Sequence, residues 1–105
     1  MKPFIDLIGA SGAVYRFRLV EDPTLLPATG GNFAYVRADG KGEHVVGCGV
    51  ARSLFKAQAS WPAAVEQHKA NGIYVRLNVA RIQREAEHED LVEGLKPPLV
   101  LVDAG

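Results

Sequence analysis

Two short apolar-rich stretches near the beginning of the chain, Phe4–Ile8 and Val14–Leu19, are strand-like, and in the second the apolar Tyr15, Phe17 and Leu19 alternate with Arg16 and Arg18. Alternation with a period of two is typical of a half-buried β-strand. Residues 9–12 lie between the two stretches, and their two glycines supply the positive φ that a tight turn requires. The pattern therefore predicts a β-hairpin, followed by a proline-containing loop over residues 21–31.

A second pair of strand-like stretches, Phe33–Arg37 and Glu43–Val46, follows this loop. Residues 39–42 join them and contain two glycines, so we expect a second hairpin. Residues 73–79 are rich in β-branched and aromatic side chains and predict a fifth strand.

Between the second hairpin and the fifth strand, the apolar period changes from two to about 3.6 residues. Pro62 cannot lie in the interior of a helix, because it lacks the backbone N–H. We therefore expect two short helices, at roughly 51–59 and 61–70, with Ser60 as the N-cap of the second. Gly72 is the expected stop signal after them.

A last helix is predicted from about residue 82 to residue 93, because three apolar residues share a face with His88. It is expected to end at Gly94, before two prolines. The order of elements predicts an α+β fold, with a mainly antiparallel sheet of about five strands flanked by about three short helices. We expect a single domain, 1–105, that consists of an N-terminal hairpin and loop (1–31) and a core (32–105).

The composition excludes several classes of protein. Twelve basic and twelve acidic residues give no net charge, which rules out a polybasic arm or an acidic tail. A single cysteine, Cys48, rules out a disulfide framework and a cysteine-rich zinc site. The N-terminus does not look like a signal peptide, and no apolar run approaches the roughly 20 residues of a membrane span. We therefore expect a cytoplasmic protein with no membrane partner.

Three segments invite a chemical interpretation. Gly47-Cys48-Gly49 is expected between a strand and a helix, where free backbone N–H groups can hold a phosphate, although a plain tight turn explains it as well. His88 and Glu85 have the Glu-x-x-His spacing of carboxylate metal sites, which makes His88 a weak metal candidate. A buried core histidine within a solvated acidic helix, with Arg81 and Arg84 as local ion-pair partners, is the alternative.

Basic side chains are spread over most of the chain, with a modest excess before Trp61. Their gathering into one phosphate-facing patch is a hypothesis for nucleic-acid binding, and scattered solubilising charge is the alternative. The candidates are Arg37, Arg52, Lys56 and Lys69.

Four segments occur in a suggestive order: Asn32–Tyr35, Val45–Gly47, His88–Val92 and Lys96–Pro98. The first two lie on successive predicted strands, and the last two end the final helix. In this order they resemble the GIY-YIG nuclease superfamily, in which two strands carry the two named tripeptides, a helix carries an arginine, and a later helix carries a metal-binding glutamate. The resemblance covers residues 32 onward and implies a three-stranded core with flanking helices.

The resemblance also implies which residues occupy the family's functional positions. Tyr35 matches the tyrosine of the first tripeptide, while Val45 replaces the tyrosine of the second. Ala57 falls at the arginine position, with Lys56 beside it, and His88 replaces the glutamate.

These replacements weaken the chemistry that the resemblance implies, which is one-metal phosphodiester cleavage. Ala57 carries no positive charge for the phosphate, and His88 brings no negative charge to a magnesium ion. Losing either group costs on the order of a hundredfold in rate. We therefore expect a small GIY-YIG-like domain without a cofactor, which binds nucleic acid or a protein partner and does not cleave.

Two alternatives remain open. The first is a divergent metal-dependent endonuclease that uses Tyr35, Lys56 and His88 with Mg²⁺ or Mn²⁺. The second is a structural or homo-oligomeric module in which the N-terminal hairpin extends the sheet or pairs across a homodimer.

Overall fold

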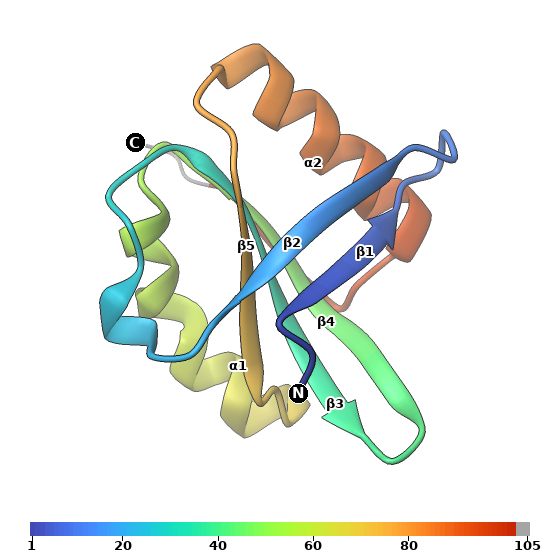
Figure 1. Ribbon diagram of the computed structural model, residues 1–105, viewed down its shortest axis with the longest axis vertical. Helices are drawn as coiled ribbons and strands as arrows, with labels where there is room; N and C mark the ends of the chain where they lie inside the picture. The colour runs from blue at the N-terminus through green and yellow to red at the C-terminus, as the bar shows by residue number, and fades with distance from the viewer. Residues whose placement is uncertain (103–105) are drawn as a thin grey trace.

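Six β-strands form one mixed sheet in the order β1-β2-β5-β3-β4-β6 (Figure 1). The computed structural model describes residues 1–102, and its fold class is α+β, as the sequence predicts. Every neighbouring pair of strands is antiparallel except β4 and β6, which run parallel. The strands are β1 Phe4–Ile8, β2 Val14–Val20, β3 Gly31–Asp39, β4 Gly42–Ala51, β5 Gly72–Leu77 and β6 Leu99–Val102.

Two α-helices lie on opposite faces of this sheet (Figure 1). One face is covered by α1, Trp61–His68, together with two 3₁₀ segments, η1 at Pro23–Leu25 and η2 at Leu54–Ser60. We call it the α1 face. The other face is covered by α2, Arg81–Leu95, and we call it the α2 face. No helix within residues 1–102 is long and apolar enough to cross a membrane.

Alternation along the strands supplies each face with its own apolar core. On β3, Phe33 and Tyr35 belong to the α1-face core, whereas Ala34 and Val36 belong to the α2-face core. The buried members on the α1 face are Val20, Leu26, Phe33, Tyr35, Val46, Ala51, Leu54, Ala57, Ala64, Ala70, Ile73 and Val75. Those on the α2 face are Ile5, Leu7, Phe17, Ala34, Val36, Cys48, Tyr74 and Leu91.

Both predicted hairpins are present, as β1–β2 and β3–β4, and β2 joins the N-terminal hairpin to the rest of the sheet through β5. The strand count differs from the prediction of five, because β6 was not expected. This strand has only four residues, directly after two prolines, and it pairs in parallel with residues 47–50 of β4. The pairing of β6 depends on a strand far away in the chain, so the local sequence around β6 gives little indication that it forms a strand.

The helices also differ from the prediction. In place of a helix at 51–59, β4 continues to Ala51 and the chain then forms η2. The second helix begins at Trp61, as predicted, and Ser60 occupies its N-cap position. The Ser60 side chain makes no capping hydrogen bond, because its backbone is helical (φ −96°, ψ −5°) and η2 runs directly into α1. Lys69 (φ 60°) and Lys96 (φ 48°) take the left-handed positions after the two α-helices, where glycines were expected.

The expected stop at Gly94 is wrong, because α2 extends to Leu95. Gly94 serves a different purpose, since a Cβ added there would lie 2.6 Å from the backbone nitrogen of Ala10. The missing side chain lets the last turn of α2 approach the tip of the β1–β2 hairpin.

Candidate functional site

Tyr35 lies on β3 and is completely buried in the α1-face core. Its ring packs against Phe33 and Trp61, with centroid separations of 5.4 and 5.6 Å. Its hydroxyl donates a hydrogen bond to the carbonyl oxygen of Ala57 at 2.5 Å. Burial raises the pKa of Tyr35 to about 12, so the phenol is neutral at physiological pH.

Lys56 lies on η2, one residue before Ala57, and is exposed to solvent. It lines a small hollow of about 190 Å³ between η2 and the ends of β4 and β6. This hollow is on the α1 face, above the side of the sheet that holds Tyr35.

His88 lies on α2, on the inward-facing stripe that also includes Arg84 and Leu91. It is only 6% exposed, as the prediction of an inward-facing histidine requires. Burial lowers the pKa of His88 below its usual value, and the charge of Glu89 offsets only part of this effect. The imidazole is therefore neutral at physiological pH.

The sheet separates the three candidate catalytic residues. Tyr35 and Lys56 lie on the α1 face, whereas His88 lies on the helix that covers the α2 face. A shared site for a metal and a phosphate requires these side chains to converge on one groove, and the fold does not bring them together. In the part of the chain that the structure describes, no three His, Cys, Asp or Glu side chains are grouped so as to hold a metal ion.

The four candidate nucleic-acid-binding residues divide into two pairs. Arg37 lies near the turn of the β3–β4 hairpin, and Lys69 follows α1 just before Asn71, whose N–H bonds to Val36. Arg52 and Lys56 lie beyond the opposite end of the hairpin, where Gly31 pairs with Ala51. Six residues of strand separate Arg37 from Gly31, which is roughly 20 Å. The four residues do not form one patch.

The Gly47-Cys48-Gly49 segment is not a strand-to-helix turn, because it lies within β4 and pairs with both β3 and β6. Its glycines make room for rings on the neighbouring strand. Gly47 faces Tyr35, and Gly49 faces Phe33, where an added Cβ would lie 2.0 Å from the ring. Burial raises the pKa of the Cys48 thiol to about 12, which leaves it unreactive.

The acidic helix is not simply a solvated face, although Arg81 does form a local ion pair, with Glu85 at 2.9 Å. Glu87 is buried and accepts hydrogen bonds from Arg76 on β5 at 2.7 Å and from Gln83 at 3.1 Å. Arg84 is also buried, and it donates to the carbonyl oxygen of Val79 at 2.7 Å instead of pairing with an acid.

Asp90 anchors the N-terminal hairpin to α2. Its carboxylate accepts hydrogen bonds from the backbone N–H of Ser11 (2.9 Å), the hydroxyl of Ser11 (2.7 Å) and the hydroxyl of Tyr15 (2.7 Å). These bonds lower the pKa of Asp90, the Ser11 hydroxyl having the largest effect. The sequence alone does not predict these contacts, because Ser11 and Asp90 are 79 residues apart.

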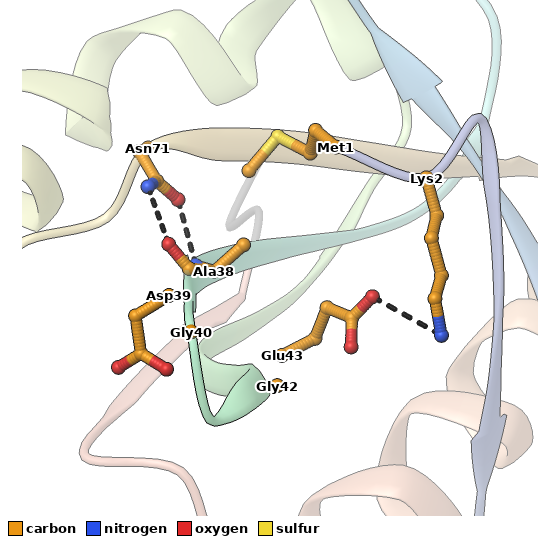
Figure 2. Close-up of a pocket in the computed structure, with 8 residues that line it drawn as sticks. All are labelled: Met1, Lys2, Ala38, Asp39, Gly40, Gly42, Glu43 and Asn71. Atoms are coloured by element: carbon orange, nitrogen blue, oxygen red, sulfur yellow. Dashed lines mark hydrogen bonds and ion pairs between the residues drawn. The ribbon is translucent and has the colours of Figure 1, made fainter.

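A hollow of about 900 Å³ lies beside the N-terminus and the turn of the β3–β4 hairpin (Figure 2). Asn71 bonds both backbone groups of Ala38 at its edge, and Lys2 forms an ion pair with Glu43 at 3.4 Å. The polar groups drawn in Figure 2 thus bond mainly to one another and do not converge on a shared ligand position.

The outer side of the N-terminal hairpin is exposed to solvent. Phe4, Ile8 and Val14 are each more than half exposed there. Arg16 lies over the ring of Phe4, 5.8 Å from its centroid, and forms an ion pair with Asp6 at 3.0 Å. This surface combines apolar and charged side chains on a strand that has a neighbour on one side only.

Comparisons with known proteins add no family to this description. No family model, no curated protein and no solved structure matches the chain.

Proposed function

We propose that this chain is a GIY-YIG-like domain that does not cleave phosphodiesters and acts by binding a protein partner. The observation that carries the proposal is the placement of Tyr35 and His88 on opposite faces of the sheet. The family's chemistry needs the corresponding groups around one phosphate.

Two observations support the GIY-YIG-like part of the proposal. From residue 31 onward, the hairpin β3–β4, the helical segment η2–α1, β5 and α2 follow one another in the order that the resemblance requires. Tyr35 and Ala57, to which the resemblance assigns the family's tyrosine and arginine positions, are also adjacent, because the Tyr35 hydroxyl donates to the carbonyl oxygen of Ala57. Ala57 is itself buried and carries only a methyl group where the resemblance implies a cation.

A protein partner is favoured over nucleic acid because the candidate cations are divided between two distant places on the fold. Nucleic-acid affinity depends on several cations that act together on one stretch of backbone. By contrast, the uncovered hairpin offers apolar side chains and an unpaired strand edge, which are features of protein–protein contacts.

The test combines a cleavage assay with a binding assay. We expect no cleavage of plasmid, single-stranded DNA or RNA in the presence of Mg²⁺ or Mn²⁺. We also expect no gel shift with these substrates at low salt and micromolar protein. Cleavage that disappears in His88→Ala but persists in His68→Ala would overturn the proposal and support the metal-dependent nuclease.

One observation favours a second candidate, a single-stranded nucleic acid bound to the outer side of the hairpin. Phe4 provides an exposed ring, and Arg16 and Arg18 lie on the same side of β2. Stacking on an aromatic residue beside arginines is a common mode of single-strand binding. A gel shift that is lost in the Arg16→Ala, Arg18→Ala double variant, and retained in Arg37→Ala, would establish this candidate.

A further inference from the structure

The free edge of β1 has a regular hydrogen-bonding capacity that the fold leaves unused. Leu19 donates to the carbonyl oxygen of Pro3 at 2.8 Å, and Gly9 donates to that of Ala13 at 3.0 Å. These bonds fix the odd-numbered residues of β1 as the ones that bond to β2. By the alternation of an antiparallel ladder, the backbone groups of Phe4, Asp6 and Ile8 point away from the sheet.

Beside this edge is a hollow of about 410 Å³, in which β1 faces the first half of β4. Ile5 and Leu7 line it from β1, and Glu43 and Val45 line it from β4. β6 does not cover this half of β4, because it pairs only with residues 47–50. A strand added to β1 would therefore place alternate side chains over this hollow, whose lining combines the apolar Ile5, Leu7 and Val45 with the charged Lys2, Asp6 and Glu43.

The charge at the centre of the edge limits what can pair there. Asp6 lies in the middle of β1 on its outer side, between Phe4 and Ile8, which are 53% and 56% exposed. A second copy that uses all three free residues in an antiparallel register would place Asp6 opposite Asp6, and like charges in that position are destabilising. Asp6 already forms an ion pair with Arg16 on β2 at 3.0 Å, and its side chain remains 47% exposed, so a basic residue opposite it would add a second favourable contact.

We infer that β1 is a docking strand for an extended segment of a partner protein, in which apolar residues flank a central basic residue. The segment adds to the sheet as a further strand. Its backbone bonds to Phe4, Asp6 and Ile8, its basic side chain lies opposite Asp6, and its inward side chains lie over the hollow. This inference rests on the proposed function and specifies the partner's chemistry.

A defined peptide probes the inference directly. It has seven residues with blocked ends, lysine at the first, fourth and seventh positions and valine elsewhere. Amide hydrogen exchange, followed by NMR on the full chain, is the measurement. At saturation we expect exchange to slow at least tenfold at Phe4, Asp6 and Ile8, with little change at Ile5 and Leu7, which already bond to β2.

Matched controls separate backbone pairing from simple contact. A peptide with N-methylated valines, and one with glutamate at the fourth position, should both bind at least tenfold more weakly. On the protein, Asp6→Pro removes the outward N–H and Asp6→Ala keeps it, while both remove the charge. Proline is tolerated on such an edge, so we expect Asp6→Pro to bind at least tenfold more weakly than Asp6→Ala.

Three results would overturn the inference. The first is unchanged amide exchange at Phe4, Asp6 and Ile8 with millimolar peptide. The second is equal binding of the N-methylated and unmodified peptides, and the third is self-association of the protein through these same amides without peptide, detected by light scattering. None of them restores nuclease activity or a gel shift, so the inference can fail while the proposed function stands. Cleavage or nucleic-acid binding would refute the proposed function independently of the peptide.

Discussion

The two faces of the sheet are held by different kinds of contact. On the α1 face, twelve buried residues form one apolar cluster, so that η2 and α1 are held mainly by packing. On the α2 face, the apolar cluster is smaller, and α2 is joined to the strands by hydrogen bonds at Arg84, Glu87 and Asp90. The second arrangement is directional, because each bond requires a donor and an acceptor in a fixed geometry.

A buried polar chain at the start of α2 illustrates this difference. The side chain of Asn32, on β3, donates to the carbonyl oxygen of Arg84 at 2.8 Å and accepts from Asn78 at 3.0 Å. Both asparagines are buried. Apolar packing on the α1 face fixes how much surface is removed from water, while the polar chain fixes where α2 begins relative to the sheet.

The largest effect is expected from the apolar face. Leu54 is completely buried in the α1-face cluster. Leu54→Ala should lower the free energy of unfolding by about 3 kcal/mol, because it leaves a cavity in addition to the lost burial. Urea denaturation measures the change. Leu25→Ala is the matched control, since Leu25 is 74% exposed, and it should cost less than about 0.5 kcal/mol. Equal costs for the two variants would contradict a packed α1-face core.

On the polar face, Asn32→Ala should lower the free energy of unfolding by about 2 kcal/mol, because it leaves buried groups of Asn78 and Arg84 without their partner. The double variant with Asn78→Ala should cost less than the sum of the two single variants, by about 1 kcal/mol. Strict additivity would show that the two asparagines do not form a coupled chain, and would weaken the contrast between the faces.

A smaller effect is expected at Tyr35, the polar group within the apolar face. Tyr35→Phe leaves the ring in place and removes the bond to Ala57, so it should cost about 1 kcal/mol. The folded-state pKa of Tyr35 is raised to about 12, above the value near 10 expected in the unfolded chain. Its neutral form therefore stabilises the fold fully below pH 10, and this contribution is lost as the pH rises toward 12.

Alkaline unfolding of wild type and Tyr35→Phe measures this dependence. The variant should lose less stability between pH 10 and 12 than the wild type. Tyr74→Phe is a comparison on the other side of the sheet, because burial also raises the pKa of Tyr74, whose hydroxyl donates to the carbonyl oxygen of Lys2. An identical alkaline profile for wild type and Tyr35→Phe would show that Tyr35 is accessible in the native state.

The difference between the two faces also explains what could be predicted from the sequence. Apolar periodicity correctly predicts both hairpins, β5 and α2, because it reports which side of each element is removed from water. It does not report why Gly47 and Gly49 are glycines. The rings of Tyr35 and Phe33 that fill their places lie on the neighbouring strand.

The polar contacts of α2 are missed for a related reason. Local sequence shows a dense run of charged residues, and such a run is commonly solvated. Outside α2, the partners of Glu87 and Asp90 are Arg76, Ser11 and Tyr15, two of which lie at the far end of the chain. Only the three-dimensional fold brings the tip of the β1–β2 hairpin against α2, where the lack of a side chain at Gly94 permits close approach.

The smallest and most local effect is expected at this junction, from Asp90→Asn. The amide cannot accept the three hydrogen bonds in the same way, so the hairpin tip should loosen without global unfolding. We expect amide exchange at Ser11 to accelerate several-fold, with little change at Phe33 in the core. Hydrogen exchange followed by NMR measures both sites in one experiment.

The acid dependence of the same variant provides an independent check. The hydrogen bonds of Ser11 and Tyr15 hold the folded-state pKa of Asp90 below the unfolded value of 3.8, so their stabilisation is present above that pH and is lost as the pH falls through the lower folded value. Wild type should therefore lose protection at Ser11 below about pH 4, whereas Asp90→Asn should show no such step. Asp22→Asn is the control, because Asp22 has a lowered pKa from Thr24 in its own turn. If that variant removed the step at Ser11, the hairpin would be held by something other than Asp90, and the α2 face would depend on packing as the α1 face does.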